Sequence, residues 1–109
     1  MRSKDVGMDK SIERQLLVEE VADVVCNHYG VDINEVFSSM RKRPVALARE
    51  TIVHMLHCDF KLPISFLSET FGRTPRWIYD ICATKRLHIS LYEDCLEEHE
   101  ILWNKIKKD

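Results

Sequence analysis

Few side chains in this 109-residue chain could do catalytic or metal chemistry. The nearest group is His54, His57 and Cys58, whose spacing lets them share part of one helix surface. A zinc site needs three or four ligands in a tetrahedral array, and no second ligand pair follows at metal spacing. Three further histidines lie elsewhere in the chain. We therefore expect polar surface and core residues here, with no metal and no cofactor.

The sequence also lacks the patterns that mark common enzymes. Glu97 and Glu98 belong to an ordinary charged segment, and neither a nucleophile motif nor a GxxxxGK[ST] phosphate loop is present. The four cysteines form no CxxC pair and sit in apolar patterns typical of buried, reduced thiols. They are Cys26, Cys58, Cys82 and Cys95. The sequence therefore predicts a protein that is not an enzyme.

Basic residues offer a different chemistry, because they gather in the middle of the chain. From Met40 to Arg86, nine Lys and Arg residues stand against four Asp and Glu residues, a net charge of +5. The rest of the chain has seven basic and fourteen acidic residues, a net charge of −7, which gives −2 overall. A basic surface on an acidic body can bind phosphates in spite of the net charge. Ordinary solvated helix faces are the plainer alternative.

The elements that position these residues are expected to be helices in one domain. Apolar residues recur at spacings of three and four, and every Gly and Pro after residue 8 falls at an expected helix boundary. The pattern predicts an all-α fold of about six helices over residues 9–109, after a disordered tail at 1–8. The expected helices are 9–29, 32–37, 44–59, 63–71, 75–85 and 90–107. No apolar run is long enough for a membrane helix, and the polar N-terminus shows no signal peptide.

The sharpest motif is ISFLSETFGRTPRWIYDICA, which begins at Ile64. Leu67 and Phe71 would anchor a first helix, Gly72 would make a tight turn, and Ile78 would hold a second helix against the first. This spacing is typical of a helix-turn-helix, whose second helix lies in the major groove of DNA. A purely structural helical hairpin is the alternative.

The second helix of this motif supplies the candidate DNA-reading residues. Those near its start or on its outer face are Thr74, Arg76, Trp77 and Asp80. Arg73 in the turn, with the first amides of the helix, could hold a phosphate.

The order of motifs along the chain is also informative. In sequence they are Val25-Cys-Asn-His-Tyr29, Gly30-Val-Asp-Ile33, Ser38-Ser-Met-Arg-Lys-Arg43, Val45-Ala46 and Arg49, then a long helix and the helix-turn-helix. Over about residues 20–86 this order resembles the C-terminal DNA-binding domain of the bacterial replication initiator DnaA. The resemblance implies a Trp-repressor-like helix-turn-helix fold that binds double-stranded DNA in replication initiation or transcription regulation. It also implies a bacterial or phage origin, and the lack of a visible signal peptide or membrane helix leads us to expect a cytoplasmic protein.

The resemblance assigns roles to the basic residues. Arg41 matches the arginine that enters the minor groove, and Arg49 matches a phosphate-contacting arginine. Lys42, Arg43 and Arg73 are expected to hold further phosphates. The family signature Gly-Gly-Arg-Asp-His-Thr-Thr is replaced by Gly72-Arg-Thr-Pro-Arg-Trp-Ile78, so the base-reading residues are not carried over.

The helix expected at 90–107 lies beyond the resemblance. It is interpreted as a cover for the core, or as a contact for a homodimer or a replication protein. The alternative function is a protein-interaction module that has lost DNA contact and binds through Trp77, Tyr79 and this acidic helix. A buried Trp77 with an Arg76–Asp80 salt bridge would favour that alternative. One open face shared by the arginines at 41, 49, 73 and 76 would favour DNA.

Overall fold

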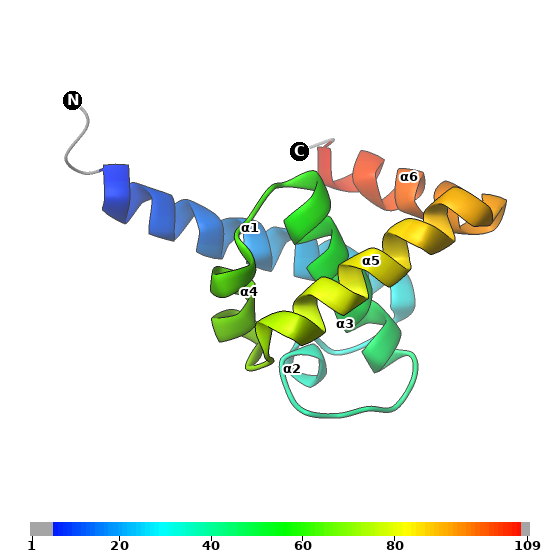
Figure 1. The fold of residues 1–109 in the computed structure, drawn as a ribbon, viewed down its shortest axis with the longest axis horizontal. Helices are drawn as coiled ribbons and strands as arrows, with labels where there is room; N and C mark the ends of the chain where they lie inside the picture. Colours follow the sequence, from blue (N-terminus) through cyan, green and yellow to red (C-terminus); the bar gives the residue numbers. More distant parts are fainter. Residues whose placement is uncertain (1–5, 108–109) are drawn as a thin grey trace.

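The structure is a computed structural model that describes residues 6–107 (Figure 1). It contains six α-helices, and no β-strand occurs within this range. The all-α fold of about six helices is therefore confirmed. The helices are α1 (Val6–Tyr29), α2 (Ile33–Val36), α3 (Val45–His54), α4 (Ile64–Phe71), α5 (Pro75–Leu91) and α6 (Glu93–Lys107), and a π-helical segment, η1 (Met55–Asp59), continues α3.

The hydrophobic core lies around α3, which packs against both α1 and α5. Side chains from α1, α3, η1, α4 and α5 meet there without access to solvent. They include Val21, Val25, Ile52, Leu56, Leu67 and Ile78. The three- and four-residue spacing of apolar side chains places each of these positions on the inner face of its helix.

The helix ends follow local signals in the sequence. Gly30 and Gly72 end α1 and α4 with positive φ angles of 69° and 63°, a conformation that glycine adopts without steric cost. Asp32 caps α2 by accepting from the amide of Asn34, and Thr74 caps α5 by accepting from the amide of Trp77. These boundaries agree with the sequence pattern.

Three expected boundaries are wrong. Helix α1 begins at Val6, within the segment expected to be a disordered tail; residues 1–5 lie outside the described residues. Helix α5 runs to Leu91 instead of about residue 85, because neither Gly nor Pro interrupts it. The break comes at Tyr92, whose backbone is extended, so α6 begins at Glu93 instead of about residue 90.

The continuous helix formed by α3 and η1 has an unusual end. Its last turn, η1, is π-helical, and Lys61, two residues after η1, has a φ of 62°. A lysine in this left-handed region carries the steric cost that glycine avoids at Gly72.

Helix α6 packs back onto α1 and α5. Its residues Leu102 and Ile106 are buried in the core. Glu98 accepts a hydrogen bond from the Tyr29 hydroxyl (2.8 Å) and lies 3.1 Å from the ring of His28. The helix therefore covers the core, as one of its interpretations expected.

Among the described helices, none combines the length and the apolar character needed to span a membrane.

Candidate functional site

The turn between α4 and α5 is tightly fixed. Leu67 and Phe71 of α4 are buried, and Ile78 buries the facing side of α5. Across the turn, the amide of Arg73 donates to the carbonyl of Ser68 (3.1 Å), and the Ser68 hydroxyl donates to the carbonyl of Arg73. The first turn of α5 is therefore held in a defined position relative to α4.

The basic loop, residues 40–43, connects α2 to α3 and is exposed along its length. Its shape is set from inside by Arg49, whose guanidinium donates to four backbone carbonyls. Nε donates to Val36 (2.8 Å), and Nη2 donates to Met40 (2.7 Å), Ser38 (3.0 Å) and Glu35 (3.3 Å). One buried side chain thus satisfies the carbonyls of the turn that leads into the loop.

The expected contact between Arg49 and a phosphate is not supported by this geometry. Arg49 is only 3% exposed, and its donors are directed at the loop backbone. Burial lowers its pKa, and the positive charge of Arg73 lowers it further. Arg49 is therefore a residue that positions the basic loop and is not part of the exposed surface.

One contact holds the start of the basic loop beside the turn before α5. Phe37, at the end of α2, stacks on Phe71, at the end of α4, with ring centroids 5.1 Å apart. The charges of Arg73 and Arg49 are also close enough to repel each other. Through the stack, segments about thirty residues apart in the sequence are brought together.

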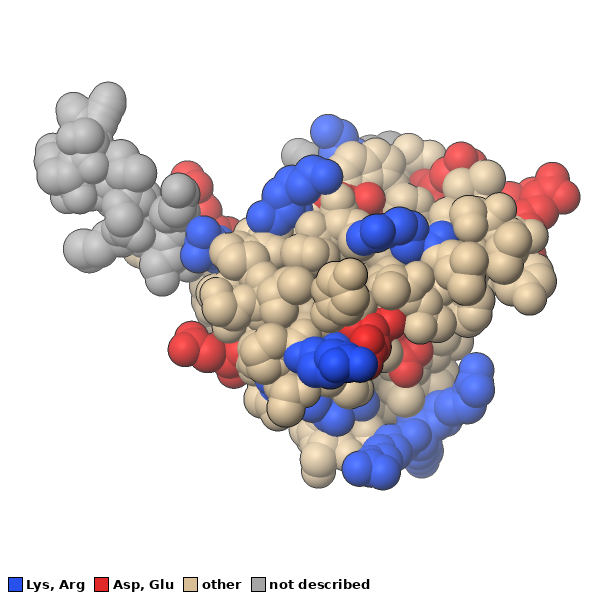
Figure 2. All heavy atoms as spheres, viewed as in Figure 1, with Lys and Arg blue, Asp and Glu red and all other residues tan. Residues whose placement is uncertain are grey.

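We use the name basic surface for the cations of these two segments: Arg41, Lys42, Arg43, Arg73 and Arg76. Figure 2 shows Lys and Arg side chains gathered in the lower part of the view, where Figure 1 places the loop after α2 and the start of α5. Acidic side chains stand mostly at the left and upper right, apart from those beside the start of α5. Other Lys and Arg side chains stand in the upper part of the same view, so cations gather around the loop and the start of α5 but are not confined to them.

Arg73 connects the basic loop to α5. Its guanidinium lies over the ring of Trp77, with the central carbon 4.9 Å from the ring centroid. Its Nη2 is buried and has no hydrogen-bond partner among the described residues. An unsatisfied buried donor costs about 1–3 kcal/mol, so a nearby acceptor would stabilise it.

The other candidate residues of α5 divide into exposed and half-buried ones. Thr74, Arg76 and Asp80 are exposed, whereas Trp77 is half-buried against the core. Arg76 pairs with Asp80 at 3.4 Å, but their side chains are 84% and 60% exposed. An ion pair this exposed contributes little to stability and opens easily.

These positions fully meet neither the criterion for a protein-interaction module nor the criterion for DNA binding that the sequence provided. The Arg76–Asp80 pair is present but Trp77 is only half-buried, and Arg49 does not share the open face.

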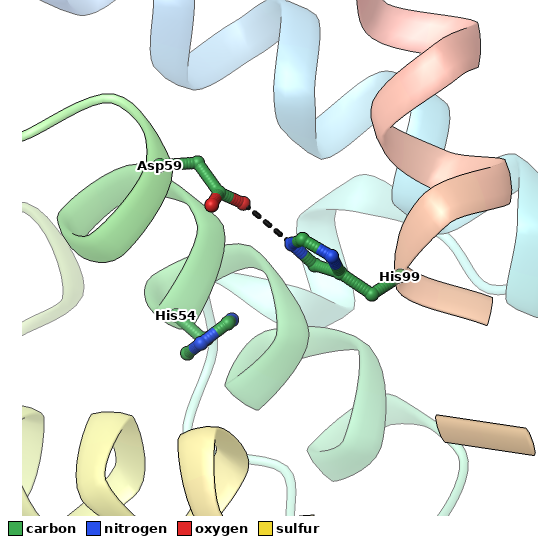
Figure 3. A group of neighbouring side chains, drawn as sticks. All are labelled: His54, Asp59 and His99. Carbon is green, nitrogen blue, oxygen red and sulfur yellow. Dashed lines mark hydrogen bonds and ion pairs between the residues drawn. The ribbon is translucent and has the colours of Figure 1, made fainter. Parts of the chain in front are cut away.

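A second cluster was missed by the sequence reasoning. His54, Asp59 and His99 come together from α3, η1 and α6 (Figure 3). Nε2 of His99 lies 2.7 Å from Oδ2 of Asp59, and this hydrogen bond raises the pKa of His99. Burial lowers the pKa of His54 to about 4, with the charges of His99 and nearby basic residues adding to the effect. The spacing of His54, His57 and Cys58 allows these three to share a helix surface, but the cluster in the structure joins His54 to Asp59 and His99 instead.

The cysteines are free thiols, as expected. Cys26 and Cys82 are buried, and burial raises their pKa to about 11 and about 12. Cys58 and Cys95 are only partly buried, so the expectation of burial holds for two of the four.

Neither a scan against protein-family models nor a search of curated proteins finds a match to this chain.

Proposed function

We propose that the chain is a non-catalytic domain that binds double-stranded DNA through its basic surface. The observation that carries this proposal is the junction of the basic loop with the turn before α5, made by the Phe37–Phe71 stack, while the hydrogen bonds of Arg49 fix the loop on α3. These contacts present two groups of cations side by side on a protein whose net charge is −2. A pairing of loop and helix suits a duplex, where a minor groove adjoins a major groove.

In this proposal α4 and α5 act as a helix-turn-helix, and α5 enters the major groove. Thr74 and Arg76 stand exposed at its N-terminus, and Asp80 follows one turn later. Arg76 has to leave its exposed pair with Asp80 to reach a base, which costs little. Freed in this way, Arg76 suits guanine, and Asp80 can accept from the amino group of cytosine.

The basic loop and the turn make the contacts that do not depend on sequence. Arg41 enters the minor groove, and Lys42 and Arg43 meet phosphates on either side. Arg73 is only partly buried and, when its guanidinium turns outward, meets a phosphate oxygen near the first amides of α5. The Trp77 ring packs against the Arg73 guanidinium, and Trp77 touches DNA only at its exposed edge.

The biological role that we propose follows the resemblance to the DnaA C-terminal domain. A domain of this kind would act in replication initiation or transcription regulation. Because Arg76 and Trp77 occur in place of the family's reading residues, we propose that it prefers a sequence other than the DnaA box.

The experiment that tests this proposal compares three matched variants by fluorescence anisotropy with a labelled duplex. Arg41→Ala and Arg76→Ala should each weaken binding by about 1–3 kcal/mol, and Arg76→Ala should also relax sequence preference. Lys105→Ala, an exposed cation at the end of α6, is the control and should bind like the wild type. Unchanged binding in both arginine variants would remove the proposed mechanism.

A protein-interaction module is the second candidate, favoured by exposed apolar residues on α5 and the segment after it. Tyr79 and Leu91 are both 62% exposed, and Leu87 and Tyr92 are exposed as well. A partner protein that binds there would leave the basic loop free. Retained binding to a partner after Arg41→Ala, together with no DNA binding by the wild type, would support this candidate.

A further inference from the structure

We propose that His54, Asp59 and His99 form a binding site for a divalent transition-metal ion, represented here by Zn²⁺. One possible ligand atom from each residue lies within 4.8 Å of the others (Figure 3). Two imidazoles and one carboxylate are a donor set that Zn²⁺ binds readily. The site is independent of DNA binding, because it lies at the end of α3 opposite to the basic loop.

His54 is the residue that points most directly to a ligand. It is only 4% exposed, and its ring is held beside that of His99, with the ring centroids 5.8 Å apart. A ligand group that its surroundings already hold in place binds an ion with little reorganisation. His54 and His99 both line a cavity of about 30 Å³, which has room for an ion or for one or two water molecules.

Asp59 and His99 need only a small adjustment to accept the ion. Their facing atoms, Oδ2 and Nε2, are 2.7 Å apart and share a proton. Two ligands on one tetrahedral zinc ion lie about 3.3 Å apart, given bonds of about 2.0–2.1 Å. Binding at both atoms therefore separates them by roughly half an ångström and requires His99 to bind as the neutral ring with its proton on Nδ1.

Water is the fourth ligand, and the surroundings set the local charge. Cys95 and Glu98 line the cavity beside His54 and His99, but both lie outside the three-residue cluster. Lys85 also lines the cavity and opposes a cation, as does the neighbouring charge of Arg86. The carboxylates of Asp59 and Glu98 offset this repulsion.

A bound ion would link helix α6 to the helix formed by α3 and η1. His99 belongs to α6, whereas His54 and Asp59 belong to the central helix and its π-helical end. A bound ion would fasten α6 to that helix and raise the melting temperature, because it binds the folded chain and not the unfolded one.

The test uses the purified, tag-free chain after treatment with a chelator. Co²⁺ is titrated in while visible absorption is followed, and Zn²⁺ affinity is measured by competition with a coloured chelator. We expect one equivalent to bind with a tetrahedral cobalt spectrum and to raise Tm. His54→Gln, Asp59→Asn and His99→Gln should each weaken Zn²⁺ binding by roughly 10–100-fold or more.

His57→Gln is the matched control, because His57 lies one turn from His54 and outside the cluster, with Nδ1 near the carbonyl of Leu62. It should keep the cobalt spectrum. Asp59→Asn changes shape least, so it keeps the test valid if a histidine variant does not fold. The proposal is overturned if the folded wild type binds no Co²⁺ or Zn²⁺, or if folded Asp59→Asn binds both metals as tightly as the wild type.

Discussion

Replacing the buried Arg49 with methionine should loosen the basic loop and weaken the whole domain. Methionine keeps much of the length of the side chain but donates no hydrogen bond. The change removes the donors that hold the carbonyls of Val36, Ser38 and Met40 at 2.7–3.0 Å. Those carbonyls must then find water, which the loop can offer only by moving outward.

The magnitude follows from the number of donors. One N–H of Nε and two of Nη2 are used, and hydrogen bonds to a charged group contribute about 1.5–3 kcal/mol each. The gross loss is offset by removing a buried charge that Arg73 repels. We therefore expect a net loss of about 2–4 kcal/mol in the free energy of unfolding.

The assay is urea unfolding followed by circular dichroism, with DNA binding measured on the same samples. Arg43→Met is the control, because it makes the same chemical change at an exposed position of the loop. It should alter stability by less than about 0.5 kcal/mol and reduce DNA affinity, whereas Arg49→Met should reduce both. If Arg49→Met is as stable as the wild type, the role assigned to Arg49 is refuted.

Three other predictions concern single residues. Thr74→Ala removes the cap of α5 and should cost about 1 kcal/mol in urea unfolding, whereas Thr74→Ser should retain most of that stability; equal losses in both would contradict the capping role. Lys61→Gly should stabilise the chain by roughly 0.5–1 kcal/mol in the same assay, because glycine relieves a positive φ; a loss would mean that Lys61 makes a stabilising contact. With chelator present, stability should fall as the pH drops from about 6.5 to 4, because buried His54 resists a proton that the unfolded chain binds. His54→Gln should remove up to about 3 kcal/mol of that fall, while the raised pKa of His99 acts in the opposite direction in both proteins; identical pH profiles would refute the assignment.

Helix positions were predictable where the sequence carries a local signal. Gly72 and the Thr74-Pro75 pair fix the ends of α4 and α5 through backbone conformation and capping, which depend on near neighbours alone. The end of α5 depends on distant packing instead. The chain turns back at Tyr92, and this turn brings Leu102 and Ile106 into the core. No Gly or Pro stands there to predict the turn from sequence.

The burial of Arg49 could be predicted from the sequence, but its hydrogen-bond partners could not. It follows Val45 by four residues and precedes Ile52 by three, so it lies on the same inner face as these buried residues. That spacing predicts a buried side chain even for an arginine. Its partners, the carbonyls of the turn before the loop, become visible only in the fold.

The histidine cluster could not be predicted from spacing. His54 and His99 are forty-five positions apart, and they meet only because α6, which packs on α1 and α5, brings His99 to the end of α3. The sequence pointed to His57 and Cys58 because a helix repeat relates neighbours only. Those two side chains lie outside the cluster that forms.

The most direct test of the proposed DNA binding is the salt dependence of wild-type affinity, measured by fluorescence anisotropy. Two labelled duplexes are compared, one of random sequence and one that carries a DnaA box. With three cations at phosphates (Lys42, Arg43 and Arg73), the slope of log affinity against log salt should be about −2.7, a loss of roughly 40-fold between about 50 and 200 mM salt. Such a slope on both duplexes, without a strong preference for the DnaA box, is the result that we predict. No binding at the lower salt concentration, or binding that salt does not weaken, would contradict the DNA-binding role.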